Sequence, residues 1–526
     1  MKTKVIKLLE KSINDLFKIN KEVQLTPSKG HGDFSTNIAM QLSKELGMNP
    51  RDIATKIVEN FKSDIVEKVE VAGPGFINIF LKSNQMSLLL KDIVDKEDKY
   101  GNGKQGKYIN VEYVSANPTG YLHVGHARGA ALGSTLSNIL IKAGNKVDQE
   151  YYINDAGNQI DTLGEATFIR YKQELGLDDK LPENTYKGQD IVFVAKELVK
   201  EFGDKYKESK YEEVSEIFKS KAKAMLLEII KKDLSAFGVE MDLYSSEQKM
   251  YDENRIQPAL DKIKKHTFEK DGATWLDTTS KGDDKDRVLI KTDGKYTYLT
   301  PDIAYHNVKL ERGYDELINV WGADHIGYIK RMEVALGYLG LPAEKVDVLT
   351  IQLVRLIKDG KELKMSKRLG TSFTLKELIE LVGKEATRFY MIDRSNNSTF
   401  DFDLDLATKQ SSENPVFTVQ YTHARANKLL ETGKDIKLGE YKDKEVELIN
   451  VLTKFPELID KMALSHKVHL LPQYLMEVAK VFNSFYSNTK IIGTDREAEL
   501  LYLVKATKIV IKNGLALMDI EAPNKM

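Results

Sequence analysis

Hydrophobic positions along this chain of 526 residues follow different periods in different regions. In the first seventeen residues they recur every three or four positions, which predicts an amphipathic helix. From Lys68 to Lys82 the pattern is extended and is interrupted by Gly-Pro-Gly at 73–75, which predicts two strands joined by a turn. The polar run from Asp95 to Lys107 has no apolar face and predicts a linker. Residues 1–105 are therefore expected to form a small α+β domain.

From Tyr108 strand and helix patterns alternate, as they do in a βαβ unit. The expected elements are a strand over 108–116, a helix over 127–143, a strand over 147–153 and a helix over 156–175. We expect residues 106–175 to be the first half of an α/β, Rossmann-like parallel-sheet domain. Residues 176–270 have a charged, helical pattern and predict an insertion into that domain.

Strand patterns return with ATWLDT, DRVLIKT and YTYLT, which we expect to extend the parallel sheet. A helix from Asp302, a strand over 316–322, a helix over 326–339 and a strand over 347–357 are expected to follow. Residues 271–410 are thus predicted to complete the sheet domain. After Asn414 apolar residues recur at helical spacing to the end, which predicts an all-helical bundle over 411–526.

Composition narrows the classes of function. With 78 Lys and Arg against 79 Asp and Glu, the chain has no long-range attraction for a polyanion, so a nucleic acid would have to bind local patches. The chain has no cysteine, which excludes disulfides, thiolate zinc sites and cysteine nucleophiles. No apolar run reaches the about 18 residues of a membrane span, and the N-terminal segment lacks the apolar core of a signal peptide. We expect a cytoplasmic protein without zinc or a membrane partner, in which magnesium arrives with a phosphate substrate.

The segment SANPTGYLHVGHARG, residues 115–129, lies between a strand and a helix, where an open parallel sheet binds nucleotides. His123 and His126 share one face of the helix start, where free backbone N–H groups favour anions. Gly125 between them leaves room for a base or a phosphate. Taken alone, the motif is equally compatible with two surface histidines at a helix cap.

A second motif, KELKMSKRLGT at 361–371, follows the last predicted strand. Lys364 and Lys367 flank Met365 and Ser366, and their long cationic side chains can reach triphosphate oxygens. By itself the segment is also compatible with a solvated basic loop. Together, the HxGH and KMSK motifs resemble the paired signature of class I aminoacyl-tRNA synthetases and related adenylyl transferases.

The chain as a whole resembles the arginyl-tRNA synthetase family. VEYVSANPTGYLHVGHARG and YTYLTPDIAYH are similar to its substrate-binding segments, and GDFSTNIAMQLSKELGMNPRDIA and VAGPGFINIFL to its N-terminal domain. VFTVQYTHARANKLL and KATKIVIKNGLALMDIEAPNKM are similar to its anticodon-binding bundle. One departure is Gly133-Ser134, where the family more often has Gly-Asp.

The resemblance implies a class I enzyme that activates L-arginine with ATP and transfers it from arginyl-adenylate to the 3'-terminal adenosine of tRNA(Arg), releasing AMP and pyrophosphate. It implies that the N-terminal domain binds the tRNA elbow and the bundle reads the anticodon. Catalysis would depend on His123, His126, Lys364 and Lys367. The other residues it assigns are Ala116, Pro118, Gly120, Gly125, His325, Met365 and Ser366 for ATP, Glu112, Asn117, Tyr298 and Asp302 for arginine, and Gln420, Tyr421 and Met526 for tRNA.

Three of these assignments keep an alternative on residue grounds. Glu112 lies in an apolar strand and needs a cation, which is either the substrate or an internal Lys or Arg. Asp302 is either a ligand or a helix N-cap. His325 is either a substrate contact or a packed histidine.

Two other functions stay open at this stage: an RNA-independent adenylating ligase with the same motifs, and a non-catalytic tRNA-binding paralogue. Polar recognition of a guanidinium rejects lysine without editing, so the insertion need not be a hydrolytic domain. We further expect a monomer whose activation of arginine requires tRNA.

Overall fold

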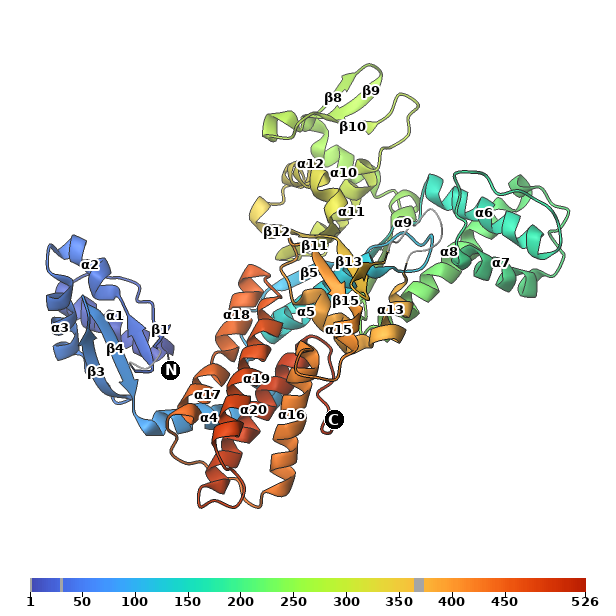
Figure 1. The fold of residues 1–526 in the computed structure, drawn as a ribbon. Helices are drawn as coiled ribbons and strands as arrows, with labels where there is room; N and C mark the ends of the chain where they lie inside the picture. The colour runs from blue at the N-terminus through green and yellow to red at the C-terminus, as the bar shows by residue number, and fades with distance from the viewer. Residues whose placement is uncertain (1, 29–31, 364–372) are drawn as a thin grey trace.

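The computed structural model describes residues 2–28, 32–363 and 373–526 (Figure 1). Its N-terminal unit is a four-stranded sheet in the order β1-β2-β4-β3 with three helices. The elements are α1 (Lys2–Phe17), β1 (Thr26–Pro27), β2 (Phe34–Thr36), α2 (Ile38–Leu46), α3 (Pro50–Asn60), β3 (Val66–Ala72) and β4 (Phe76–Leu81). The predicted first helix and the predicted pair of strands after Lys68 are confirmed, and Ile77 and Ile79 of β4 alternate into the core.

The centre of the molecule is a five-stranded parallel sheet in the order β12-β11-β5-β6-β7 (Figure 1). Its strands are β5 (Tyr108–Glu112), β6 (Lys146–Ile153), β7 (Leu243–Ser246), β11 (Glu316–Gly322) and β12 (Val346–Ile351). Later strands lie on both sides of β5, so the sheet is doubly wound and its switch point lies between β5 and β11. The predicted Rossmann-like architecture is confirmed, with a ligand crevice expected at the carboxyl ends of these two strands.

Several strand predictions were wrong. ATWLDT and DRVLIKT do not join the parallel sheet, because β8 (Thr267–Lys270), β9 (Ala273–Leu276) and β10 (Arg287–Ile290) form a separate antiparallel sheet. Asp271 and Gly272 both have positive φ in the β8–β9 turn, as a tight hairpin requires. YTYLT is not a strand, because it leads into helix α11 (Leu299–Glu311).

The strand expected over 347–357 is two strands in two sheets. After β12, the chain enters β13 (Val354–Lys358), which pairs with β14 (Lys361–Glu362) and β15 (Phe400–Asp403). The strand β7 was missed within the stretch expected to be helical. The side-chain pattern over 347–357 correctly indicates an extended backbone, but it does not fix which neighbour each part pairs with.

Helices surround the sheet, and three of them form a projection to one side (Figure 1). The projection is α6 (Asn158–Glu174), α7 (Gln189–Phe202) and α8 (Tyr211–Ala236), which share a core of their own that includes Phe218. The remaining helices of this region are α5 (Val124–Lys142), α9 (Glu247–Asp252), α10 (Ile256–Ile263), α12 (Ile326–Tyr338), α13 (Leu375–Val382), α14 (Lys384–Ile392) and α15 (Leu404–Thr408).

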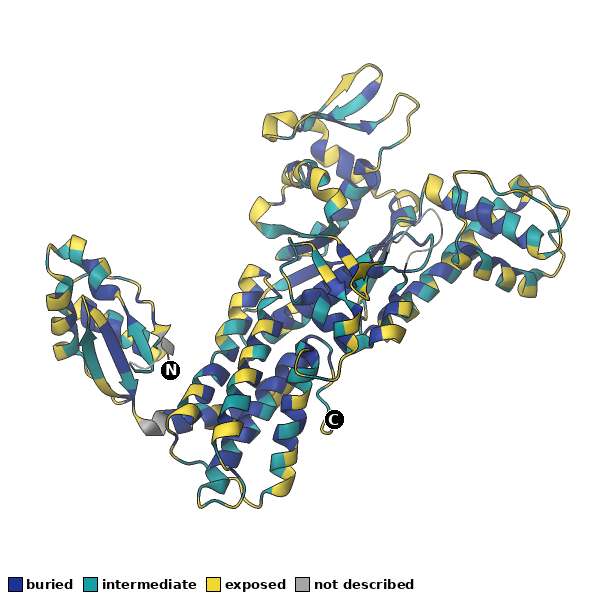
Figure 2. Ribbon diagram, viewed as in Figure 1, coloured by how far each residue is buried: buried dark blue, intermediate teal, exposed yellow. Residues whose placement is uncertain are grey.

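The C-terminal region is the predicted all-helical bundle, with each helix buried along one face (Figure 2). Its helices are α16 (Pro415–Thr432), α17 (Lys444–Leu452), α18 (Phe455–Ser465), α19 (Leu470–Asn488) and α20 (Glu497–Leu517). No helix within the described ranges is long and apolar enough to span a bilayer.

The expected linker is not a free connection. It follows α4 (Ser83–Lys96), begins with the 3-10 turn η1 (Glu97–Lys99) and docks on the bundle. The ring of Tyr100 stacks on Phe455 at 6.1 Å, and Asn513 Nδ2 donates to the carbonyl of Glu97 at 2.8 Å. Tyr100 and the backbone acceptor thus anchor a segment whose composition alone predicts flexibility.

Arg388 of α14 ties three distant segments together. Its fully buried guanidinium donates to the carbonyl of Phe237 at 2.9 Å, to Ser134 Oγ at 2.7 Å and to the carbonyl of Met518. Ser134, which departs from the Gly-Asp pattern of the resembled family, therefore serves this packing contact. Gly133 beside it is required because a Cβ there would lie 2.2 Å from the ring of Tyr113.

Candidate active site

The HVGH segment begins helix α5 at the switch point of the sheet. His123 is the N-cap, and its Nδ1 accepts from the Gly125 N–H at 3.1 Å. His126 Nδ1 accepts from the His123 N–H at 3.1 Å, and the two rings lie 3.8 Å apart. Both imidazoles are thereby held at the start of a 19-residue helix, where an anion is favoured.

The chain that follows the KMSK segment returns to this helix start. Leu375 N–H donates to the Leu122 carbonyl at 2.8 Å, and Val124 N–H donates to the Phe373 carbonyl at 3.3 Å. His123 and Thr374 form a β-bridge between these bonds. Lys364, Met365, Ser366 and Lys367 lie outside the described residues, but the residues shortly after their segment, from Phe373 to Leu375, are paired with the HVGH segment.

The other ATP-site candidates lie in the loop after β5 and beside β11. The carbonyl of Ala116 accepts from Tyr151 at 2.6 Å, Pro118 is buried, and Gly120 faces the Asp190 carboxylate, which would lie 2.5 Å from a Cβ. His325 follows β11 with a side chain that is 59% exposed, so the reading as a packed histidine is wrong.

Glu112 has an internal cation, which was the alternative left open by the sequence. Its Oε2 accepts from Lys309 Nζ at 2.6 Å and from Tyr305 at 3.0 Å. Its Oε1 accepts from Ser115 Oγ at 3.1 Å. Lys309 is fully buried, so this ion pair belongs to the interior of the protein at the carboxyl end of β5.

Asp302 is not the N-cap of α11, so that alternative is wrong. Tyr298 holds the cap position, and Asp302 lies one turn further on, where its Oδ2 accepts from Tyr328 at 2.6 Å. Burial raises the pKa of Asp302 to about 7 despite that hydrogen bond, and the charge of Glu112 adds to the rise. An aspartate in this environment favours a cationic ligand, because a cation would stabilise its charged form.

Glu247 is a site candidate that the sequence did not reveal. It is the first residue of α9, directly after β7, and is only 5% exposed. Burial raises the pKa of its carboxyl to about 8, and Asp302 and Asp155 contribute further to the rise. The signal would have been a carboxylate at the carboxyl end of a sheet strand, but β7 itself was not recognised.

The remaining arginine-site candidates lie around these carboxyls. Tyr298 is 68% exposed at the start of α11. Asn117 Nδ2 donates to Gln159 Oε1, at the start of α6. The charge of Glu112 acts on Asp302 and that of Asp302 on Glu247, whereas Asn117 makes its side-chain hydrogen bond to Gln159.

The tRNA-site candidates lie on α16 and the C-terminal tail. Gln420 Nε2 is bonded to the Glu521 carbonyl at 2.9 Å, whereas Tyr421 and Met526 are 38% and 53% exposed. Tyr421 lies between the ring of Phe417, at 5.7 Å, and the guanidinium of Arg425, at 4.7 Å. A pocket of about 220 Å³ borders these side chains.

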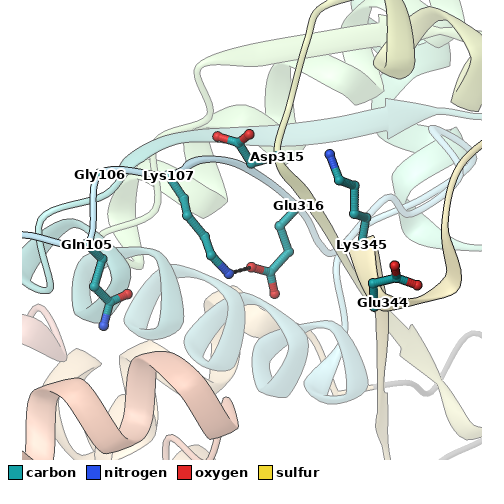
Figure 3. A pocket seen from close by; sticks show the side chains of 7 residues that line it. All are labelled: Gln105, Gly106, Lys107, Asp315, Glu316, Glu344 and Lys345. Carbon is teal, nitrogen blue, oxygen red and sulfur yellow. Dashed lines mark hydrogen bonds and ion pairs between the residues drawn. The ribbon is translucent and has the colours of Figure 1, made fainter.

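A larger pocket of about 410 Å³ lies at the edge of the parallel sheet where β5 and β11 begin, opposite the edge that carries the HVGH segment (Figure 3). Lys107 and Glu316, which pair at 2.9 Å, line it at the amino ends of β5 and β11 together with Asp315, Glu344 and Lys345. Nucleotides bind at the carboxyl ends of such strands, so its position does not fit the catalytic chemistry. Across the ranges that the structure describes, no cluster of three His, Asp or Glu side chains could hold a metal ion.

Comparison with known proteins covers the whole chain. The family model "tRNA synthetases class I (R), catalytic domain" matches residues 89–410, "Arginyl tRNA synthetase N terminal domain" matches 1–81, and "DALR anticodon binding domain" matches 419–526. An arginine--tRNA ligase of Metamycoplasma arthritidis is 47% identical and one of Mycoplasma mobile is 48% identical, each over 99% of both chains.

The fold is also that of a solved relative. The structure of arginyl-tRNA synthetase from Thermus thermophilus superposes with a TM-score of 0.79 and 22% identity over 100% of both chains. The sequence resemblance, the doubly wound sheet and the helical bundle agree with these matches. The chain belongs to the arginyl-tRNA synthetase family of class I aminoacyl-tRNA synthetases.

Proposed function

We infer that this chain ligates L-arginine to tRNA(Arg) in two steps, through an arginyl-adenylate formed from ATP. The observation that carries the inference is the pair of carboxyls, Asp302 and Glu247, at the carboxyl end of a doubly wound sheet that also presents the HVGH helix start. Their pKa values are raised mainly by burial, and neither carboxyl forms an ion pair within the described residues, so a bound guanidinium would supply the missing cation.

The ATP side of the reaction is assigned to the two signature motifs. His123 and His126 at the start of α5 hold the triphosphate on one side, and Lys364 and Lys367 hold it on the other, with magnesium carried in as part of the MgATP substrate. Attack of the arginine carboxylate on the α-phosphate needs little covalent help from the protein. The task of these side chains is to keep the groups in line and to neutralise charge as pyrophosphate leaves.

Arginine lies between α11, α9 and the loop after β5. Asp302 and Glu247 face the guanidinium, and Tyr298 packs against it. Asn117 and Glu112 bind the substrate's hydrogen-bond donors nearer its amino-acid end. The nucleotide is bordered by the remaining ATP-site candidates, which are Ala116, Pro118, Gly120, Gly125 and His325, and by Met365 and Ser366 of the KMSK segment.

Asp302→Asn tests the arginine site. The substitution removes the charge but keeps the acceptor for Tyr328, so we expect the Michaelis constant for arginine to rise roughly tenfold or more, with little change for ATP. The Michaelis constant of the wild type for arginine should fall as pH rises through about 7, because the Asp302 proton must leave when the guanidinium binds. In the variant this constant should depend less steeply on pH.

The matched control is Asp252→Asn, which changes an exposed carboxyl on α9. ATP–pyrophosphate exchange with tRNA present, together with melting temperatures, measures both variants. An unchanged arginine constant in Asp302→Asn, or an equal loss in the control, would remove Asp302 from the site.

RNA contacts are assigned to both ends of the chain. Residues 1–105 bind the tRNA elbow, the sheet domain in 106–175 and 271–410 binds the acceptor end with the insertion 176–270 beside it, and 411–526 reads the anticodon. Tyr421 is the favoured base contact because its exposed ring borders the 220 Å³ pocket, with Gln420 and Met526 nearby. The enzyme acts as a cytoplasmic monomer.

Activation of arginine requires tRNA. RNA bound to the flanking regions completes the ATP site, which is a form of induced fit. Exchange stimulated by arginine should therefore appear only when tRNA(Arg) is added, and a non-cognate tRNA is the control. Strong exchange without tRNA would contradict the requirement while leaving the ligase assignment in place.

A further inference from the structure

Four carboxyls near the arginine site differ in their partners. Glu112 pairs with Lys309 at 2.6 Å and Asp155 pairs with Lys223 at 3.0 Å. Asp302 and Glu247 take part in no ion pair with any residue in 2–28, 32–363 or 373–526. Two of the four charges are therefore compensated before any substrate binds.

Lys309 forms its ion pair with Glu112. It lies on α11 two turns after Asp302, and its ammonium is fully buried. Besides Glu112 Oε2, it contacts Asn319 Oδ1 of β11 at 3.3 Å and lies 4.6 Å from the centre of the Tyr305 ring. A buried ammonium is stable only with such partners, so its position is fixed.

The pairing divides the two oxygens of Glu112 between different tasks. Oε2 accepts from Lys309 and Tyr305, whereas Oε1 accepts, within the described part of the chain, only from Ser115 Oγ. A carboxylate anchored at one oxygen holds the other in a fixed direction. Oε1 is thus a preset acceptor that brings no net charge to the crevice.

We propose that Lys309 is a positioning residue for arginine: it fixes Glu112 as a charge-compensated acceptor, so that the substrate guanidinium is matched by Asp302 and Glu247. The proposal rests on the arginine site assigned above. Lys309 acts through Glu112 and does not touch the substrate.

The surroundings define what removal of Lys309 would do. Besides Asp302 and Glu247, the titratable neighbours are His306, whose Nδ1 lies 2.8 Å from the Asp302 carbonyl, and Glu150 of β6. Burial lowers the pKa of His306 to about 4, so His306 supplies no replacement cation near neutral pH. Burial would raise the pKa of Glu150, but Lys309, Ser245 and Arg312 lower it to about 2, so it stays charged.

In a Lys309→Met variant Glu112 would lose its ion-pair partner and the contact that fixes its orientation, so Oε1 would no longer be a preset acceptor for arginine. We expect the Michaelis constant for arginine to rise at least tenfold at pH 7, with the ATP constant and the turnover number changed less than threefold. Lys309→Arg should restore much of the affinity because it keeps the charge.

A double-mutant cycle separates this role from a purely structural one. In a Glu112→Gln background, Lys309→Met should change the arginine constant by less than twofold, because the acceptor through which Lys309 acts is absent. Lys262→Met is the control, since Lys262 contacts α11 through Asn307 but is half exposed. A lower melting temperature with an unchanged arginine constant, or additive effects in the cycle, would overturn the proposal.

If Lys309→Met alone does not fold, the double variant still tests the proposal. The Glu112→Gln/Lys309→Met protein replaces a buried ion pair by neutral side chains, which proteins often tolerate. Its arginine constant should equal that of Glu112→Gln alone, and a further tenfold difference would overturn the proposal. Wild-type enzyme that fails to activate arginine in the same assay would instead refute the function itself.

Discussion

The sheet domain and the C-terminal bundle bury different kinds of side chain. In the sheet domain Arg128, Glu150, Lys309 and Arg388 are completely buried, each bonded to charged or carbonyl partners. Among the Asp, Glu, Lys and Arg side chains in the described part of the bundle, only Glu445 is buried, and it pairs with Arg496; the buried histidines there are His423 and His466. Buried charges are costly to maintain, so their concentration around one sheet marks where the protein must hold ligands in a fixed geometry.

The largest expected effect tests the apolar core of the bundle. Phe482 of α19 is fully buried among aromatic neighbours, including Phe485 at 6.2 Å. Phe482→Ala should lower the free energy of unfolding by about 3–5 kcal/mol through lost contacts and a cavity. Denaturant titration measures the loss, and the arginine Michaelis constant should stay unchanged in the folded fraction.

Leu464→Ala is the control for that variant, because Leu464 is 72% exposed on α18. Its effect on the free energy of unfolding should stay within about 0.5 kcal/mol. A similar loss in both variants would mean that burial does not decide stability in the bundle.

The next prediction tests the buried charges of the sheet domain, where removal of a carboxyl should raise stability and weaken arginine binding. Since the folded-state pKa of Glu247 is raised from 4.5 to about 8, the carboxyl destabilises the fold increasingly as pH rises between these values. Glu247→Gln should therefore melt higher than the wild type, with a gap that widens up to pH about 8. The arginine Michaelis constant should rise about tenfold, as expected when a charged hydrogen bond to the substrate is lost.

Melting curves from pH 5 to 9 and exchange kinetics check this pair of outcomes, with Asp252→Asn again as the exposed control. If Glu247→Gln lowered both stability and arginine affinity, the carboxyl would be a structural part of the sheet domain. The contrast between paired and unpaired carboxyls would then lose its functional meaning.

The smallest effect concerns the surface of the bundle. Tyr421→Ala should weaken tRNA binding about fivefold, at the lower end of what stacking on one base contributes, with little change in stability because the ring is part-exposed. Phe417→Leu, which keeps an apolar side chain beside the same pocket, is the comparison variant. Unchanged tRNA affinity in Tyr421→Ala would move the anticodon contact away from this pocket.

Sequence periodicity predicted the bundle and the parallel sheet, because helices and strands with one apolar face leave a direct record in residue order. The place of β7 in the sheet depends on its distant partner β6, and β9 pairs with the adjacent strand β8, which lies in the stretch expected to be helical, so both assignments failed. The same limit affected the site. The motifs located His123 and His126, but whether Glu112 faced Lys309 or the substrate depended on the docking of α11 against β5.

The contacts of Arg388 have a consequence for how the protein folds during its synthesis. Synthesis proceeds from the N-terminus, and domains generally begin to fold as they emerge. The α14 guanidinium needs the carbonyl of Met518, which is made 130 residues later and close to the end of the chain. Until Met518 has been made, the sheet domain contains a cation without one of its acceptors, so its final packing must wait for the segment that follows the bundle's last helix.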